Sequence, residues 1–211
     1  MKTIFLSAGI PELKKGRAPR YFETADITAI RDAVLSLTYV CLKLDIKIVW
    51  GGHPAITPIV YEAIRSYEEK ERMSCSRLSD SEIKTYIQNH VHLFQSSWFK
   101  DILPEDNNKF ENVTLTERQD NILDSLYQMR LEMLKSYDLS AAIYIGGMEG
   151  VIAEDALFNQ CHPDKPTYPI ASTGGAALEL YEQYGHERDY HSNLLSNYAY
   201  TSLFYSILSS N

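Results

Sequence analysis

Short apolar runs alternate along the chain with longer segments whose apolar residues recur at helical spacing. The runs that predict strands are TIFLSAG (3–9), IKIVWGG (46–52), NHVHLF (89–94), AAIYI (141–145) and PTYPIAS (166–172). Helical patterns cover 27–44, 55–73, 116–137, 176–184 and 193–208. Thr116 is the expected N-cap of the third of these helices. Strands separated by helices of this length imply right-handed crossovers and a parallel sheet.

This pattern predicts an α/β fold, a single Rossmann-like domain over residues 1–211, with a parallel sheet of about five or more strands and helices on both faces. A chain of 211 residues with 45% hydrophobic residues can bury one proper core. Segment 95–115 is polar and rich in turn-forming residues. We expect it to be a long loop that serves function.

Charge and cysteine content narrow the class of protein. The net charge of −8 and the pI near 5.2 argue against non-specific binding to nucleic acid or to anionic membranes, which both need a positive field. Cys41, Cys75 and Cys161 are widely spaced and odd in number, so we expect reduced thiols. The N-terminal apolar run is too short for a signal peptide, and segment 198–208 is too short to span a bilayer. We expect a cytoplasmic protein.

Glycines follow four of the five predicted strands. They lie in SAGIP (7–11), WGGHPAIT (50–57), IGGMEG (145–150) and ASTGGAA (171–177). In parallel sheets ligands bind beyond the carboxyl ends of the strands, where the strand order reverses. Glycine lets a ligand approach the backbone, and the following helix supplies N–H groups to an anion. Each Gly-Gly pair alone is also consistent with a tight turn, but their coincidence predicts one anion-binding crevice.

The pattern Arg130…Gly146-Gly147-x-x-Gly150-Val151-x-x-Glu154 resembles the signature of the LOG-type nucleotide phosphoribohydrolases, also called lysine-decarboxylase-like proteins, and of the wider SLOG superfamily. Those proteins carry an arginine on the preceding helix and then PGGxGTxxE. Segment 50–57 stands where the family has its first glycine-rich loop. The resemblance implies a Rossmann-like fold and a nucleotide-related ligand.

Three departures separate this chain from the hydrolase signature. Ile145 replaces the proline, one extra residue separates Gly147 from Gly150, and Val151 replaces the threonine. In the hydrolases the resemblance implies that the glutamate and arginine act at the ribose and the N-glycosidic bond. In SLOG domains of bacterial immune and signalling systems the same pocket is thought to bind nucleotide-derived messengers such as cyclic ADP-ribose variants. STGGAA at 172–177 is more similar to that branch.

We therefore predict a ligand site at the strand ends. Its residues are Ser7, Gly9, Gly51, Gly52, His53, Arg130, Gly146, Gly147, Met148, Glu149, Gly150, Glu154, Ser172, Thr173, Gly174 and Gly175. Glu154 can accept hydrogen bonds from two ribose hydroxyls, or can complement the positive end of its helix. Arg130 is either a phosphate clamp or a solvated surface residue. His53 either contacts the ligand or caps the turn.

Two functional hypotheses follow. The first is a binding module for an ADP-ribose-like or cyclic nucleotide signal, acting as a sensor or sequestering protein in bacterial antiphage defence. The second is a nucleoside 5′-monophosphate phosphoribohydrolase, in which Glu154 and Arg130 are catalytic. A third, weaker hypothesis is a nucleoside deoxyribosyltransferase-like enzyme, suggested by the small-residue turn in FLSAGIP (5–11).

Other chemistries lack support in the sequence. His90 and His92 would alternate on one strand face, yet no third ligand follows at zinc-like spacing, so we predict no metal. No serine-nucleophile elbow, dinucleotide GxGxxG or Walker A lysine is present, and we predict no cofactor. A sensor of this kind would pass its signal to an effector protein in trans. Tyrosines near the C-terminus either form a homo-oligomer interface or lie in the core; they are Tyr190, Tyr198, Tyr200 and Tyr205.

Overall fold

The computed structural model describes residues 1–13, 18–74, 79–102, 105–185 and 192–209. Within them, six strands form one sheet in the order β4-β3-β2-β1-β5-β6, and every neighbouring pair is parallel. The strands are β1 (Lys2–Gly9), β2 (Ile46–Gly51), β3 (Val91–Ser96), β4 (Val113–Thr116), β5 (Ala141–Gly146) and β6 (Thr167–Ile170). The predicted α/β class is confirmed.

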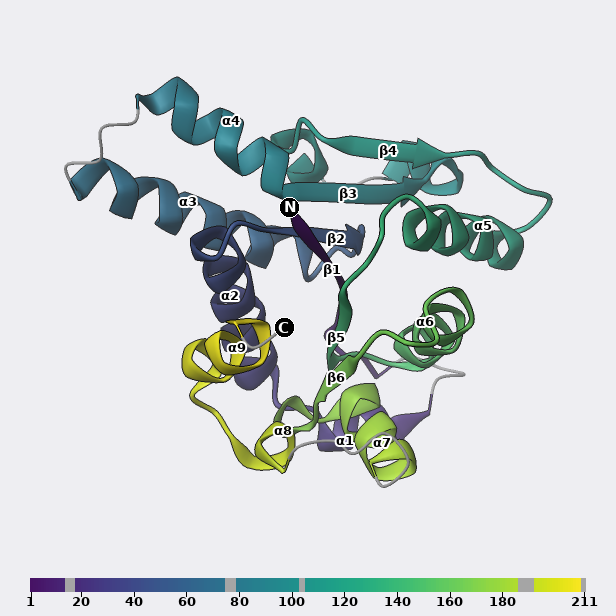
Figure 1. The fold of residues 1–211 in the computed structure, drawn as a ribbon. Coiled ribbons are helices and arrows are strands. Elements are labelled where there is room, and N and C mark those ends of the chain that lie inside the picture. The colour runs from purple at the N-terminus through teal and green to yellow at the C-terminus, as the bar shows by residue number, and fades with distance from the viewer. Residues whose placement is uncertain (14–17, 75–78, 103–104, 186–191, 210–211) are drawn as a thin grey trace.

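Helices cover both faces of the sheet (Figure 1). They are α1 (Pro19–Thr24), α2 (Ile27–Lys43), α3 (Thr57–Met73), α4 (Asp80–His90), α5 (Ile122–Lys135), α6 (Glu149–Cys161), α7 (Gly175–Tyr184), α8 (Asn193–Ser196) and α9 (Tyr200–Ser209). Short 3₁₀ helices are η1 (Ser97–Ile102), η2 (Glu105–Lys109) and η3 (Ala171–Thr173). Helices α2, α3, α4 and α9 bury one face, and α5, α6 and α7 bury the other.

The central strands are apolar because both of their faces are covered. Every residue of β3 and β5 is buried, which is typical of a parallel sheet between two helical layers. Alternate residues enter the two cores: Ile4 and Leu6 of β1 face α2, whereas Phe5 faces α6 and α7. The same alternation places Ser7 on the face of Phe5.

Strand order fixes where the chain reverses direction across the sheet. From β1 the chain moves outward through β2, β3 and β4, and then returns through α5 to β5 on the other side of β1. The switch point therefore lies between the carboxyl ends of β1 and β5. This is where ligands bind in open α/β sheets.

The prediction for the third strand was wrong at its start. Residues 80–90 form α4, whose N-terminus carries a capping box between Ser79 and Glu82. His90 is the last residue of this helix, not a strand residue. Its ring lies 2.9 Å from Asp45 Oδ1 and 2.6 Å from the Tyr86 carbonyl. The expected alternation of two histidines on one strand face therefore does not exist.

The predicted loop 95–115 is partly regular. It contains the last two residues of β3, the 3₁₀ helices η1 and η2, and the start of the edge strand β4. Thr116 ends β4, and the residue that caps α5 is Asn121, which accepts a hydrogen bond from the Asp124 N–H at 3.0 Å. The N-cap prediction at Thr116 was wrong because an edge strand occupies the position.

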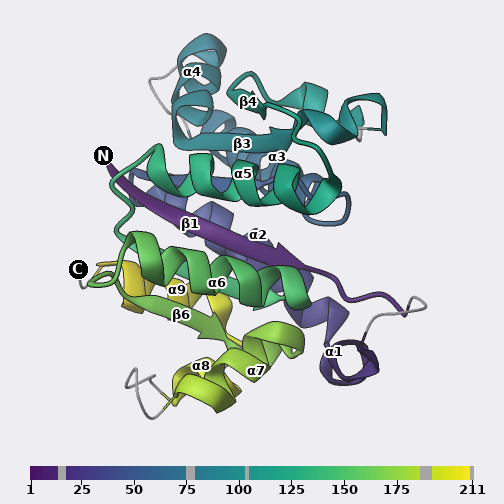
Figure 2. The same ribbon diagram turned by 90° about the vertical axis from the view of Figure 1, so that its right-hand side faces the viewer.

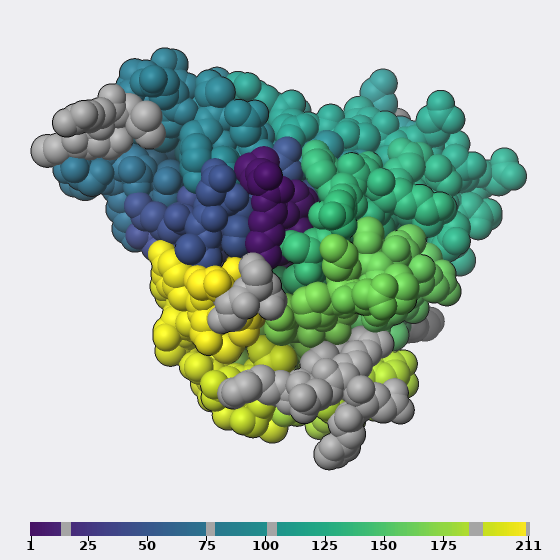
Figure 3. Space-filling view, viewed as in Figure 1, coloured from purple at the N-terminus to yellow at the C-terminus, as the bar shows by residue number. Residues whose placement is uncertain are grey.

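The C-terminal helix predicted over 193–208 is two helices. Asn197 is extended (ψ 121°) and separates α8 from α9. Helix α9 lies against α2, and the yellow surface of α9 meets the blue surface of α2 in Figure 3. In the part of the chain that the structure describes, no helix is long and apolar enough to cross a membrane.

Candidate functional site

The turns that follow β1 and β5 touch each other at the switch point. Gly9 pairs with Gly146 in register, and the Gly147 N–H donates to the Gly9 carbonyl at 2.7 Å. A Cβ at Gly9 would lie only 3.2 Å from Gly147 Cα. A side chain at Gly9 would therefore require the Gly147 backbone to shift by a few tenths of an ångström.

The turn after β6 joins the same cluster. The Ala176 N–H donates to the Gly147 carbonyl at 3.0 Å, and the Gly146 N–H donates to Thr173 Oγ1 at 2.8 Å. Gly175 has φ +61°, and a Cβ there would lie 2.7 Å from the Gly147 oxygen. Three of the predicted glycine turns therefore meet at one edge of the sheet, where they brace one another.

A charged cluster lies beside these turns, on the face covered by α5 and α6. Arg130 Nε donates to Glu154 Oε1 at 2.9 Å, and Ser7 Oγ donates to Glu154 Oε2 at 2.5 Å. The side chains of Arg130 and Glu154 are only 17% and 15% exposed. The structure thus brings together three predicted site residues from β1, α5 and α6.

Local geometry explains why these side chains meet. Ser7 points to the α6 face, and Glu154 lies about one and a half turns after the start of α6. Gly150 precedes Glu154 by one turn and faces the arginine. A Cβ at Gly150 would lie 3.2 Å from Arg130 Nη2, so glycine leaves room for the guanidinium.

The turn after β2 lies next to β1 at the same edge. His53 Nδ1 accepts a hydrogen bond from the Ala55 N–H at 3.1 Å, so the ring caps this turn. Its Nε2 lies 3.8 Å from where a Cβ of Gly9 would be, which places the ring beside the switch point. Gly51 and Gly52 do not face the charged cluster. A Cβ at Gly51 would approach Met129, and one at Gly52 would overlap the Gln95 amide.

The side chains after β6 form hydrogen bonds with backbone groups and not with the charged cluster. Ser172 Oγ donates to the Asn197 carbonyl at 3.1 Å, and Thr173 Oγ1 donates to the Ile170 carbonyl at 2.6 Å. A Cβ at Gly174 would lie 1.9 Å from the Thr24 carbonyl oxygen. These predicted residues hold the turn in place, and their side chains are not gathered with Glu154.

The remaining predicted residues lie at the start of α6. Met148 is 8% exposed and belongs to the core beneath α6. Glu149 is exposed, and its carboxylate lies 3.5 Å from the Ala18 N–H of the segment before α1. Glu149 therefore faces the α1 connection, while Glu154 faces α5.

Two exposed residues on the helical face of Arg130 were not predicted. Tyr127 and Leu123 precede Arg130 on α5 by three and seven residues and are 50% and 74% exposed. Helical spacing from Arg130 is the signal that could have identified them.

A second polar cluster lies on the same face, nearer the amino ends of the strands. His92 Nδ1 lies 2.6 Å from Tyr137 Oη, and its Nε2 lies 2.8 Å from Thr114 Oγ1. Burial, with a smaller contribution from the Lys47 charge, lowers the pKa of His92 to about 4. A neutral ring has one donor and one acceptor nitrogen, which suits two hydroxyl partners. A hollow of about 410 Å³ adjoins this ring between β3, β4 and α5.

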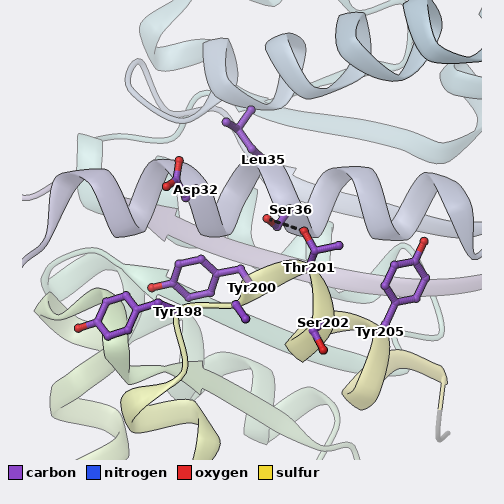
Figure 4. A pocket seen from close by; sticks show the side chains of 9 residues that line it. Asp32, Leu35, Ser36, Tyr198, Tyr200, Thr201, Ser202 and Tyr205 are labelled. Atoms are coloured by element: carbon purple, nitrogen blue, oxygen red, sulfur yellow. Dashed lines mark hydrogen bonds between the residues drawn. The ribbon is translucent and has the colours of Figure 1, made fainter.

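A shallow groove of about 730 Å³ lies far from the charged cluster, between α2 and α9 (Figure 4). Tyr198 and Tyr200 lie side by side along it, and the hydrogen bond from Thr201 to Ser36 crosses its middle. Tyr200 is 4% exposed and belongs to the core, whereas Tyr198 is 61% exposed. Tyr190 lies outside the described residues. Tyr200 is therefore a core residue, and the exposed Tyr198 has no role fixed by burial.

The described residues were also compared with what a metal site or a reactive thiol needs. No group of three or more His, Cys, Asp or Glu side chains in the described ranges is placed to hold a metal ion. Cys41 is a buried free thiol whose pKa is raised by burial, and Cys161 is also free. Cys75 lies outside the described residues.

Comparison with known proteins agrees with this architecture. The model of the SLOG cluster3 family matches residues 20–208, and the chain belongs to that family. No curated protein matches the chain. The chain is similar to the X-ray structure of the structural genomics target TM1055, with a TM-score of 0.54 and 13% identity over 86% of this chain and 81% of that chain. At this identity the likeness concerns the fold alone. The predicted membership of the SLOG superfamily is confirmed.

Proposed function

We propose that this member of the SLOG cluster3 family binds a nucleotide-derived small molecule at the switch point between β1 and β5. One observation carries the proposal: Ser7, Arg130 and Glu154 form a partly buried, charged cluster beside the glycine turns of β1 and β5. The family itself supports a nucleotide-related function. The cluster lies at the switch point of the strand order, which is where ligands bind in open α/β sheets.

The cluster keeps hydrogen-bonding capacity for a ligand. A guanidinium has five N–H donors, and Arg130 uses the one on Nε for the 2.9 Å hydrogen bond to Glu154, the contact it makes within the described residues. Each carboxylate oxygen of Glu154 accepts one hydrogen bond but has two lone-pair sites. Arg130 can therefore hold a phosphate while Glu154 accepts from ribose hydroxyls. A local cation matters because the chain as a whole is acidic, at −8.

Binding without turnover is the favoured form of this function, with an ADP-ribose-like or cyclic nucleotide as the ligand. The partners of Glu154 are a hydroxyl and a guanidinium, and neither group donates a proton readily to a leaving base at neutral pH. Hydrolysis of a nucleoside 5′-monophosphate is the second candidate. It is favoured by the salt bridge with Arg130, which would position the Glu154 carboxylate against an oxocarbenium-like centre.

Calorimetry with nucleoside monophosphates, ADP-ribose and cyclic ADP-ribose variants tests the proposal, followed by chromatography of each mixture for free base. We expect binding, weakened in Glu154→Gln, and no base released. The matched control is Glu182→Gln, the same charge change at an exposed position of α7. Base released from a monophosphate by the wild type and not by Glu154→Gln would establish the hydrolase. If no compound binds, the site assignment fails.

The signal is expected to pass to other proteins. We expect the bound form to act on an effector protein in trans and the chain to form a homo-oligomer. Sedimentation with and without the tightest ligand of the panel measures the second expectation. A monomer under both conditions would contradict it.

A further inference from the structure

One face of α5 extends from the charged cluster toward the carboxyl ends of the strands. Leu123, Tyr127, Arg130 and Leu134 recur at spacings of four, three and four residues, which places them on a single helical face. Helix α5 begins at the carboxyl edge because it leaves β4 and returns to the amino end of β5. Figure 2 shows α5 and α6 side by side in front of β1.

Exposure rises steadily along this face. Leu134 is 0% exposed, and the Arg130 side chain is 17% exposed. Tyr127 is 50% exposed and Leu123 is 74% exposed. The same helical face is therefore closed at the amino edge and open at the carboxyl edge.

Helix α6 explains the difference between the two ends. At the closed end, His162 Nε2 lies 2.8 Å from the Leu134 carbonyl and fastens the end of α6 to α5. At the open end α6 has only just begun, and it presents Gly150 and the exposed methyl group of Ala153. Both of these residues are small, and Tyr127 and Leu123 stay exposed at this end of α5.

We propose that Tyr127, supported by Leu123, is the platform on which the heterocyclic base of the ligand stacks. This inference rests on the proposed function. Residues three apart on a helix are neighbours, so Tyr127 lies one turn from Arg130 on the same helical face and can extend the charged cluster with an aromatic surface. The cluster itself offers a hydroxyl, a carboxylate and a guanidinium, which suit ribose and phosphate but provide no flat apolar face. A half-exposed aromatic ring supplies that face to any base.

Calorimetry on Tyr127→Ala and Tyr127→Phe tests the platform with two ligands, ADP-ribose and ribose 5-phosphate, which lacks a base. We expect Tyr127→Ala to weaken ADP-ribose binding at least about fivefold, because base stacking is lost. We expect Tyr127→Phe to bind as the wild type does, and ribose 5-phosphate to bind all three proteins equally. Tyr198→Ala is the matched control, since it removes another tyrosine of similar exposure on the opposite face of the sheet.

The other outcomes distinguish a failure of the platform from a failure of the proposed function. Equal ADP-ribose affinity in Tyr127→Ala and wild type would overturn the platform while leaving the proposed function intact. Equal weakening of both ligands would overturn the assignment to the base. A dimer that dissociates in Tyr127→Ala, with unchanged affinity, would assign this face to a contact between copies of the chain. If wild type binds neither ligand but binds another nucleotide of the panel, the same variants are compared on that nucleotide. If it binds none, the proposed function fails and the platform with it.

Discussion

Two polar clusters lie on the same face of the sheet, and they differ in charge and in what surrounds them. The first joins Ser7, Arg130 and Glu154 near the carboxyl ends of the strands. The second joins His92, Tyr137 and Thr114 nearer the amino ends. Both are mostly buried and both connect a strand to α5 or to the segment that follows it.

The difference shows that polar burial alone does not mark a binding site. In the His92 cluster both ring nitrogens have a hydroxyl partner, and burial keeps the ring neutral by lowering its pKa to about 4. In the Glu154 cluster a full cation and a full anion face each other beside an open helical face, with donors and acceptors to spare. The first arrangement stabilises a fold, whereas the second can exchange an internal partner for a ligand.

Removal of the cation should give the largest effect and separate the two clusters. We expect Arg130→Ala to weaken nucleotide binding by roughly 1.5–3 kcal/mol, about ten- to hundredfold, because a charge-assisted contact is lost. Calorimetry measures it. Tyr137→Phe removes a hydroxyl from the His92 cluster and should leave affinity unchanged. An equal loss of affinity in the two variants would erase the functional distinction between the clusters.

Acid should destabilise the protein through His92. The folded pKa of about 4 lies below the ordinary value of 6.5, so this ring contributes stability that is fully present above pH 6.5 and is lost as pH falls toward 4. Between pH 7 and pH 4.5 we expect the loss to be about 2 kcal/mol. Urea unfolding at pH 7, 5.5 and 4.5 measures it in wild type and His92→Gln. The stability gap between the two proteins should narrow on acidification, and a constant gap would contradict the assignment.

Loss of the Ser7 hydroxyl should give a smaller effect. Ser7→Ala removes the 2.5 Å hydrogen bond to Glu154 and leaves the salt bridge to Arg130 in place. We expect the free energy of unfolding to fall by about 1.5 kcal/mol, the lower end for the loss of one hydrogen bond to a charged group. Ser7→Thr restores a hydroxyl and serves as the comparison. Unchanged stability in Ser7→Ala would show that the carboxylate finds another donor.

Gly150→Ala should give the smallest effect, with opposite signs for stability and binding. Alanine favours the helix over glycine by about 0.5–1 kcal/mol, so α6 should gain stability. The new Cβ would lie 3.2 Å from Arg130 Nη2 and would displace the guanidinium by a few tenths of an ångström, as an estimate from ordinary contact distances. We expect affinity to fall about twofold. If stability and affinity both rise or both fall, glycine at position 150 is not what leaves room for the Arg130 guanidinium.

The sequence by itself determined the architecture and the neighbourhood of the site. Apolar runs of strand length separated by helical patterns require a parallel sheet with two helical layers, and such a sheet brings all carboxyl ends to one edge. The spacing from Arg130 to Glu154 identified the superfamily before any side chain was placed. The hydrophobic pattern did not locate the boundary between helix and strand near residue 90. A capped helix over residues 80–90 ends in His90, directly before β3.

Only the tertiary structure decided which side chains meet. Ser7 and Glu154 are 147 residues apart, and their hydrogen bond depends on the face that β1 turns toward α6. Ser172 and Thr173 belong to the same predicted crevice, yet the Ser172 hydroxyl donates to the Asn197 carbonyl, and the Thr173 hydroxyl donates to Ile170 and accepts from the Gly146 N–H. A one-residue change of register reverses the face of every strand residue, and the packing of distant helices selects the register. The direction of a side chain at a strand end is therefore a property of long-range packing, which the order of residues along the chain does not specify.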